Sequence, residues 1–298
     1  MKLFRVLFVM SLTSFYSVSL GMVEKLLTPF DIINIKYNKN FEKLYYGEHS
    51  RQFGHLRLPN NESNKKLPVI VVIHGGCWIS KFASVNFMEP FSQELQSIGY
   101  AVWNIEYRTS DINGGGWPGT FLDVASSISY LKEISELCNL DLDNITLIGH
   151  SSGGHLALWY ANKDSLSKDS DIYSEDTIKP KLAVNIAGPT DLKQFCDHEK
   201  IACGEEVISN LLLKVNSDNK DSRYHDASPH NLISSDINQV LLVGSKDNCL
   251  PVKYLERYKQ SADAIGASVK LFVLDDVGHF DFLSPNSESF RFMLKNIK

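Results

Sequence analysis

Short apolar runs rich in β-branched residues alternate along this chain with longer segments in which apolar residues recur at helical spacing. Six runs have the length and composition of buried strands, at residues 69–74, 101–107, 144–149, 182–187, 239–244 and 269–274. Five helical segments lie between or after them, at residues 86–98, 120–137, 153–162, 251–265 and 287–295. This alternation is typical of an α/β fold in which helices cover both faces of a mostly parallel sheet.

Two weaker strands, 44–46 and 54–58, are expected to add an antiparallel edge to the sheet. Two polar segments interrupt the alternation: residues 163–179, and residues 191–235 with a short helix expected at 205–213. Open α/β sheets bind ligands beyond the carboxyl ends of their strands, so the second segment is placed to form a small cap over a site there. How both insertions fold over the site is expected to decide the substrate.

The N-terminus has the pattern of a secretory signal peptide. Lys2 and Arg5 precede the apolar residues 6–16, and small residues follow at 17–21. We therefore expect a leader at residues 1–21, a single domain at 22–298 and a secreted or periplasmic protein; a retained membrane anchor is the alternative. The rest of the chain has no apolar run long enough to span a bilayer, so we expect no stable membrane span in the mature chain.

Composition and charge limit the classes of partner that we expect this protein to bind. The formal charge of −5 and the pI near 6.0 give no basic face, which excludes nucleic acid as a primary partner. Among the five cysteines, Cys196 and Cys203 bracket a short polar loop and are the favoured disulfide pair in an oxidising compartment; two free thiols are the alternative. The same pair, with His198 between, lacks the close Cys spacing of zinc sites, and no metal is expected.

Gly149-His150-Ser151-Ser152-Gly153 has the G-x-S-x-G pattern of a nucleophile elbow, directly between an apolar strand and a helical segment. The sharp turn exposes the serine hydroxyl, and its glycines are required because a side chain there would collide with neighbouring backbone. A phosphate-binding turn is the alternative, but the P-loop lysine and the G-x-G-x-x-G spacing are both missing. Ser151 is therefore the predicted nucleophile.

His74-Gly75-Gly76-Cys77-Trp78 also follows an apolar strand. The glycines allow backbone to approach a substrate oxygen, and this loop supplies an oxyanion-hole donor in folds with a nucleophile elbow. We assign the donors to the N–H groups of Gly76 or Cys77, with Gly75 adjacent, and to the N–H of Ser152. Trp78 is expected either to line a substrate pocket or simply to pack, and His74 to order the loop.

A nucleophilic serine needs a base and an orienting acid, in the chain order Ser, acid, His for this fold. Asp247 follows the fifth strand, and His279 follows the last, so both emerge at the edge of the sheet where Ser151 lies. The rival acids Asp275, Asp276 and Asp281 share the loop of the histidine itself. His150 and His155 flank the nucleophile but are expected to point along the sheet and the helix.

From about Tyr45 to Lys298 the chain resembles the α/β-hydrolase branch that contains arylformamidases (kynurenine formamidases), feruloyl-esterase-like enzymes and hormone-sensitive-lipase-like esterases. The resemblance lies in H-G-G-C-W at 74–78, Tyr107-Arg108, G-H-S-S-G-G-H at 149–155, Asp247 and His279. It implies an architectural role for Tyr107-Arg108. Cys77 stands where the lipase-like esterases usually have a third glycine, and the H-G-G-x-W form is similar to that of the formamidases.

The resemblance and the triad together predict a serine hydrolase that cleaves small acyl or aryl carboxylic esters through an acyl-enzyme, with no metal or organic cofactor. An arylformamidase is the alternative within the same class. A non-catalytic binding module on the same fold is the alternative of another class, and the presence of all three triad residues in order argues against it.

Overall fold

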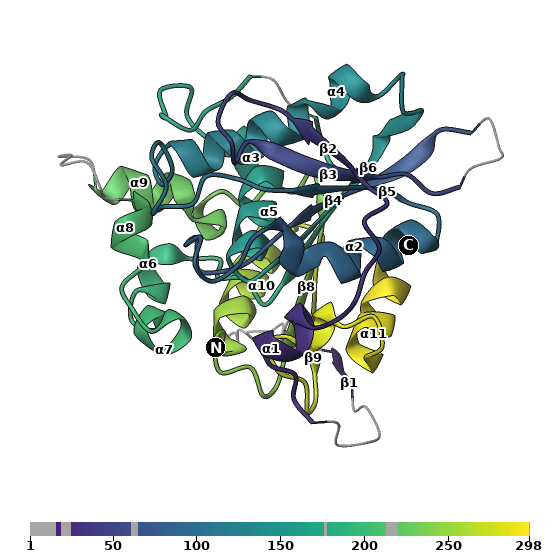
Figure 1. Ribbon diagram of the computed structural model, residues 1–298. Helices are drawn as coiled ribbons and strands as arrows, with labels where there is room; N and C mark the ends of the chain where they lie inside the picture. Colours follow the sequence, from purple (N-terminus) through teal and green to yellow (C-terminus); the bar gives the residue numbers. More distant parts are fainter. Residues whose placement is uncertain (1–15, 19–24, 61–64, 176–177, 213–219, 298) are drawn as a thin grey trace, which may run out of the picture.

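The computed structural model describes residues 16–18, 25–60, 65–175, 178–212 and 220–297. Its centre is one nine-stranded sheet in the order β1-β9-β8-β7-β6-β4-β5-β3-β2, antiparallel only where β3 pairs with β2 and β5 (Figure 1). The strands are β1 (Tyr16–Val18), β2 (Glu42–Tyr45), β3 (Phe53–Arg57), β4 (Leu67–Ile73), β5 (Ala101–Ile105), β6 (Leu140–His150), β7 (Leu182–Ile186), β8 (Asn238–Gly244) and β9 (Val269–Leu274). The predicted α/β class and the antiparallel edge are confirmed.

Strand β4 shows why the central strands are apolar throughout. Successive side chains of a strand point to opposite faces of the sheet. Val69, Val71 and Ile73 belong to one buried cluster, whereas Ile70 and Val72 belong to another, and all five are at most 1% exposed. The sheet therefore has a hydrophobic core on each face.

Helices cover both cores. On one face, α3 (Gly119–Ser129), α5 (Ser152–Asn162) and α10 (Lys253–Ala264) contribute Phe121, Leu156 and Leu255. On the other, α2 (Glu89–Ser97) and α11 (Glu288–Asn296) contribute Phe91 and Phe290. The helix expected at 120–137 is two helices, because α3 ends at Ser129 and α4 (Leu131–Ile134) follows. Short 3₁₀ turns complete these connections, η1 (Val85–Met88), η2 (Lys163–Ser165), η3 (Pro229–Asn231) and η4 (Asp281–Leu283).

The insertion between β7 and β8 has more structure than its sequence indicates. One helix was expected at 205–213, but the described residues of the insertion form four, α6 (Leu192–Phe195), α7 (Glu199–Cys203), α8 (Ile208–Leu212) and α9 (Lys220–Ala227). Each is too short for its apolar residues to show a helical period. The buried carboxylate of Glu199 accepts the N–H groups of Val207 and Ile208 at 2.7 and 2.6 Å, which fixes the start of α8. We call α6 to α9 the cap.

The N-terminal region adds two elements that the sequence analysis missed. Helix α1 (Pro29–Ile33) begins with a capping box between Thr28 and Asp31 and with proline at its first position, a signal that could have predicted it. Strand β1 pairs in parallel with β9. Three residues of the predicted leader form β1, and its other residues lie outside the described part of the chain. Within that part, none of the helices combines the length and the apolar composition required to cross a bilayer.

The favoured disulfide between Cys196 and Cys203 is wrong. Cys203 forms a disulfide with Cys77, 126 residues earlier, with the Cα atoms 6.1 Å apart. Cys196 is a free thiol, and its Sγ lies 3.3 Å from the carbonyl oxygen of Leu192 and 3.6 Å from the hydroxyl of Tyr224. The folding of the cap turns the end of α7 toward the loop after β4, and proximity along the sequence cannot reveal that placement.

Candidate active site

Ser151 lies at a strained turn between β6 and α5. Its φ of 53° and ψ of −123° lie in a region that residues other than glycine rarely adopt. The turn requires its glycines: a Cβ on Gly149 would lie 2.0 Å from the carbonyl oxygen of Gly153, and one on Gly153 would lie 2.1 Å from that of Ile73. The turn holds the Ser151 side chain at the carboxyl edge of the sheet, at the N-terminus of α5.

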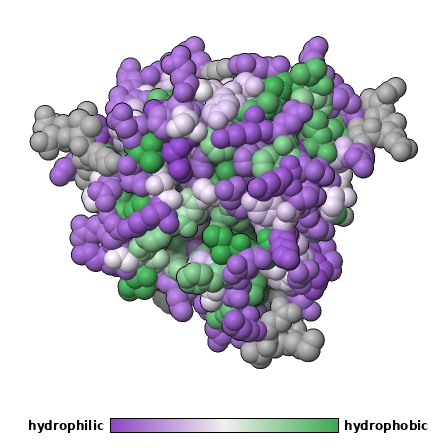
Figure 2. All heavy atoms as spheres, viewed as in Figure 1, coloured by the Kyte–Doolittle hydropathy of each residue, from purple (hydrophilic) through white to green (hydrophobic). Residues whose placement is uncertain are grey.

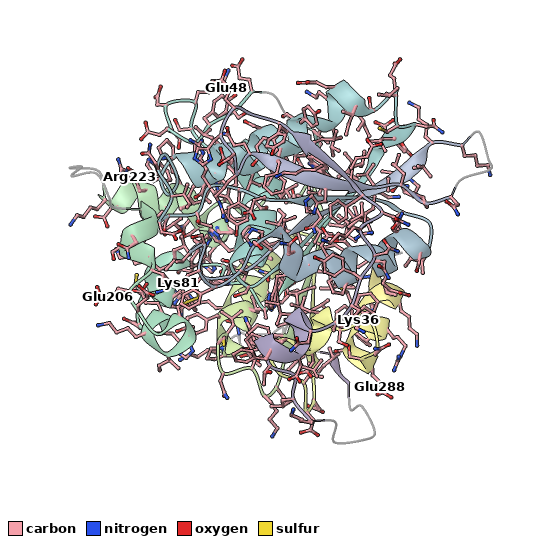
Figure 3. The ribbon with its side chains drawn as sticks, viewed as in Figure 1. Lys36, Glu48, Lys81, Glu206, Arg223 and Glu288 are labelled. Carbon is pink, nitrogen blue, oxygen red and sulfur yellow. A yellow bond between two sulfur atoms is a disulfide. The ribbon has the colours of Figure 1, made fainter. Side chains whose placement is uncertain are left out.

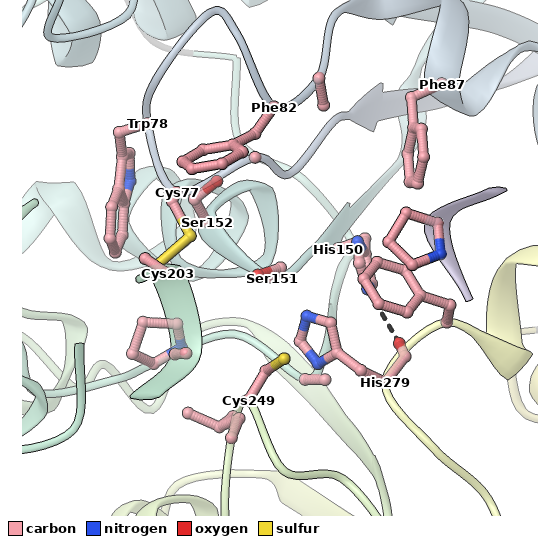
Figure 4. Close-up of a pocket in the computed structure, with 18 of the residues that line it drawn as sticks. Cys77, Trp78, Phe82, Phe87, His150, Ser151, Ser152, Cys203, Cys249 and His279 are labelled. Carbon is pink, nitrogen blue, oxygen red and sulfur yellow. Dashed lines mark hydrogen bonds between the residues drawn. A yellow bond between two sulfur atoms is a disulfide. The ribbon is translucent and has the colours of Figure 1, made fainter. Parts of the chain in front are cut away.

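His279 and Asp247 meet beside Ser151 on the loops that follow β9 and β8. The Nδ1 atom of His279 lies 2.7 Å from Oδ2 of Asp247, and both side chains are buried. The other carboxylate oxygen, Oδ1, accepts the N–H groups of Cys249 and Leu250 at 2.8 and 2.7 Å, which fixes the carboxylate plane. Figure 4 shows the imidazole directed toward Ser151 across the floor of the cavity.

The rival acids have other partners. Asp281 accepts the N–H groups of Gly278 and Leu27 at 2.6 and 3.0 Å, so it closes the loop that carries His279. Asp276 is exposed and lies 3.7 Å from Lys246. Within the described residues, Asp247 is the carboxylate that bonds to the ring of His279.

The loop after β4, residues 74–78, faces Ser151. Gly76, Cys77 and Trp78 have φ values of 105°, 53° and 56°, three consecutive left-handed residues. Within the described residues, no acceptor is recorded for the N–H groups of Gly76 and Cys77, and the N–H of Ser152 is in the first turn of α5, where helical partners are absent. A Cβ on Gly75 would lie 3.0 Å from Cβ of Ser151, so the loop can come this close to the serine only because residue 75 is glycine. These N–H groups can therefore donate hydrogen bonds to a negatively charged oxygen beside Ser151.

Buried polar groups support this loop from behind. His74 places Nδ1 at 2.7 Å from the carbonyl oxygen of Gly75 and Nε2 at 2.9 Å from Glu106. Tyr107 stacks on the His74 ring and donates its hydroxyl proton to the His74 carbonyl at 2.9 Å. Burial alone would raise the pKa of Glu106, but His74 and Arg51 lower it overall, so the carboxylate stays charged.

A cavity of about 220 Å³ opens over Ser151. Gly76, Cys77, Trp78, Ser152 and His279 line it with Ser151; Gly75 and Asp247 lie directly behind. Sequence reasoning missed other lining residues, notably Phe82, Phe87, Phe195, Cys203, Cys249 and Phe280. None of the described residues of 163–179 lines the cavity, so of the two insertions the cap alone contributes to it.

Aromatic side chains form two walls of the cavity. Trp78 and Phe195 meet edge to face on the cap side, with ring centroids 6.4 Å apart, and Phe87 and Phe280 meet similarly on the other side at 6.2 Å. Phe82 is 44% exposed at the mouth. In Figure 2, apolar residues gather around a hollow on an otherwise mostly hydrophilic face. The cavity is therefore suited to apolar groups on either side of Ser151.

His150 contacts the loop that carries His279 instead of pointing away along the sheet. Its Nε2–H donates to the carbonyl oxygen of His279 at 2.9 Å, and the two rings lie 4.6 Å apart. Burial, and secondarily the nearby His279, hold the pKa of His150 well below its usual value. A neutral His150 can support the position of His279 without adding a positive charge next to it.

His155 connects the loop 74–78 to the cap. Its Nδ1 accepts the indole N–H of Trp78 at 3.2 Å, and its Nε2–H donates to the carbonyl oxygen of Ala227 at 2.7 Å. Burial lowers the pKa of His155 to about 4. The neutral ring therefore contributes to stability only while it remains unprotonated.

His155 should make the folded state sensitive to acid. The unfolded chain binds a proton at this residue below about pH 6.5, whereas the folded chain does so only near pH 4, so stability present above pH 6.5 is lost as the pH falls toward 4. We expect His155 to account for about 3 kcal/mol of that loss. Urea unfolding at several pH values should show a shallower pH dependence in His155→Gln. The exposed His225→Gln is the control; equal pH dependence in both variants would contradict the assignment.

One group of side chains in the site has metal-ligand chemistry. Candidate ligand atoms of Asp247, Cys249 and His279 lie within 4.8 Å of one another. Burial, followed by the charge of Asp247, raises the pKa of the Cys249 thiol to about 11. Because Asp247 and His279 already bond to each other, an ion here would have to displace that hydrogen bond.

A strand-to-helix serine turn, with a histidine and its acid on loops that follow later strands of a mostly parallel sheet, defines the α/β-hydrolase class. Within this class the chain belongs to the BD-FAE family, which matches residues 55–261.

Several esterases are similar to the chain. It is 23% identical to the esterase LipC of Mycobacterium tuberculosis over 81% of its own length and 60% of LipC. It is 25% identical to the isoprenylcysteine alpha-carbonyl methylesterase ICME of Arabidopsis thaliana, over 84% of the chain and 60% of ICME. The chain thus spans less than two thirds of these curated relatives.

Solved structures show the same fold. Esterase B from Lactobacillus rhamnosis superposes with a TM-score of 0.74 at 20% identity, over 86% of this chain and 84% of that one. A truncated carbohydrate esterase from gut microbiota superposes with a TM-score of 0.68 at 20% identity, over 88% and 97% of the two chains. The predicted α/β-hydrolase fold is confirmed by these neighbours.

Proposed function

We propose that this protein is a serine hydrolase that cleaves small, neutral carboxylic esters. The observation that carries the proposal is that Ser151, at a strained elbow, shares one cavity with His279, which bonds to Asp247. Membership of the BD-FAE family and the similarity to proteins named esterases support an ester as the substrate.

The proposed mechanism has two half-reactions. His279 takes the hydroxyl proton as Ser151 Oγ attacks the ester carbonyl, Asp247 stabilises the resulting imidazolium, and the N–H groups of residues 76, 77 and 152 bind the oxyanion. The imidazolium then gives the proton to the departing alcohol, which leaves an acyl group on Ser151. Water, deprotonated by His279, attacks the acyl-enzyme; the carboxylic acid departs and Ser151 regains its proton.

The lining of the cavity argues for uncharged substrates. Among the described residues that line it, there is no lysine, arginine, aspartate or glutamate. A carboxylate on the acyl chain would have to leave water without gaining a partner, which costs free energy. The aromatic walls instead offer apolar contact to a short acyl group and to an aryl or alkyl alcohol.

A comparison of two chromogenic esters of equal chain length tests this preference. We expect p-nitrophenyl butyrate to have a kcat/KM at least ~10-fold higher than p-nitrophenyl hemisuccinate, because the second buries an unpaired carboxylate. A panel from acetate to octanoate, with a feruloyl ester, an acetylated xyloside and N-formylkynurenine, places the preference among related activities. Equal rates for the two matched esters would contradict the apolar assignment, and a sharp preference for N-formylkynurenine would favour an amide hydrolase.

We also propose that residues 1–21 are a cleaved leader, whose removal takes β1 away and leaves β9 at the edge of the sheet, and that the mature protein is secreted or periplasmic. A disulfide between Cys77 and Cys203 supports this proposal, because disulfides persist mainly in oxidising compartments. N-terminal sequencing of protein recovered from the medium or periplasm should find a start near residues 20–22. An intact N-terminus on membrane-associated protein would contradict it.

A further inference from the structure

A disulfide joins the loop 74–78, which carries the proposed oxyanion donors, to the cap. Cys77 is the fourth residue of the loop 74–78 and a predicted oxyanion donor, and Cys203 is the last residue of α7. Both cysteines line the cavity, and Figure 4 shows the sulfur–sulfur bond in its wall beside Trp78. The bond therefore connects the group that would bind the oxyanion to the segment that covers the substrate.

The loop needs external support because of its backbone conformation. Cys77 and Trp78 both have positive φ values although neither is glycine, and each such residue costs on the order of 1–3 kcal/mol. Such a conformation persists only where the surroundings fix it. Trp78 is held by its indole bond to His155 and by its carbonyl oxygen, which accepts the N–H and hydroxyl of Ser110 at 2.8 and 3.0 Å. The Cys77 side chain packs against the hydrophobic core, and its covalent restraint is the disulfide to Cys203.

An ion pair also joins the same two segments within the described chain, but it is weak. Lys81, just after the loop, forms an ion pair with Glu205, just after α7. The two side chains are 59% and 40% exposed, and exposed pairs contribute between zero and about 1 kcal/mol. Figure 3 shows Lys81 next to the cap segment that carries Glu206. Of these two links, the disulfide is the stronger.

We propose that Cys77 and Cys203 are positioning residues: their disulfide holds the N–H groups of Gly76 and Cys77 in the orientation that binds the oxyanion. This inference rests on the proposed ester hydrolysis. The oxyanion develops in the transition state, so loosening its donors lowers kcat while substrate binding by the aromatic walls, and hence KM, changes little.

Reduction of the native protein tests the proposal directly. A dithiol such as dithiothreitol gives two electrons and two protons to the disulfide, forming two thiols, and becomes a cyclic disulfide itself. The rate of p-nitrophenyl butyrate hydrolysis is divided by the number of active sites, which is counted by end-point labelling with a fluorophosphonate. A loss of folded protein then does not lower the measured kcat.

Cys203→Ser tests the disulfide without changing the loop that carries the oxyanion donors. It removes the bond by a substitution in the cap and leaves Cys77 in place. We expect both the reduced wild-type protein and Cys203→Ser to lose at least ~10-fold in kcat per labelled site, with KM changed less than ~3-fold. Dithiothreitol should have no further effect on Cys203→Ser. Reoxidation should restore the wild-type rate. Cys196→Ser, which removes a free thiol from the same cap, should respond to reduction as the wild type does.

The proposal would be overturned if Cys203→Ser kept the full kcat per labelled site. If the number of labelled sites also fell, the bond would only stabilise the fold. Failure of the proposed function is a separate result: the oxidised wild-type protein would then neither hydrolyse the ester nor react with the fluorophosphonate, and the positioning role would fall with it.

Discussion

Replacing Ser151 with alanine is expected to lower ester hydrolysis by about 10⁶-fold while the protein remains folded. Serine and alanine carry the same backbone strain at a φ of 53°, so the substitution removes the hydroxyl and little else. Without the nucleophile no acyl-enzyme forms, and the oxyanion donors alone leave roughly 10³-fold catalysis over water. The measurement is kcat with p-nitrophenyl butyrate, together with thermal unfolding followed by circular dichroism.

Covalent labelling provides an independent readout of the same substitution. A fluorophosphonate should label the wild-type protein and fail to label Ser151→Ala. The exposed Ser97→Ala, at the end of α2, is the matched control and should be labelled normally. Retention of more than about 1% of the wild-type rate by folded Ser151→Ala would show that another group is the nucleophile.

Replacing Asp247 with asparagine should lower kcat by about 10⁴-fold, the effect expected when the histidine is held in the wrong tautomer. Oδ1 of Asp247 accepts two backbone N–H groups, from Cys249 and Leu250, and an asparagine side chain can keep those bonds only with its carbonyl oxygen. Its NH₂ group then faces Nδ1 of His279, 2.7 Å away in the native protein. The proton moves to Nε2, and the ring can no longer accept the serine proton.

Asp276→Asn is the control for this substitution, since Asp276 is exposed and on the loop of His279. It should keep a kcat within about twofold of the wild type, because a substitution at an exposed site away from the chemistry has little effect. Fluorophosphonate labelling of Asp247→Asn should be slow but complete, because Ser151 is still present. A rate loss larger for Asp276→Asn than for Asp247→Asn would mean that the acid has been misassigned.

The strands were predictable because burial on both faces leaves a direct trace in the sequence. In β4 every residue from Val69 to Ile73 packs in one core or the other, so the run is apolar without interruption. The positions of Ser151, Asp247 and His279 followed from the same runs, since Ser151 directly follows β6, the other two lie on the loops after β8 and β9, and parallel strands end at one edge.

The sequence by itself determined the α/β class, the serine elbow with its glycines, and the chain order of the three candidate catalytic residues, because each depends on a local run or a local turn. Only the tertiary structure decided that Cys77 bonds to Cys203, that Phe87 and Phe280 form a wall opposite Trp78 and Phe195, and that α1 reaches the cavity through Pro29. Those contacts join segments far apart in the chain. Their residues carry no periodic signal, so only the packing of the cap and the loops onto the sheet determines which of them meet.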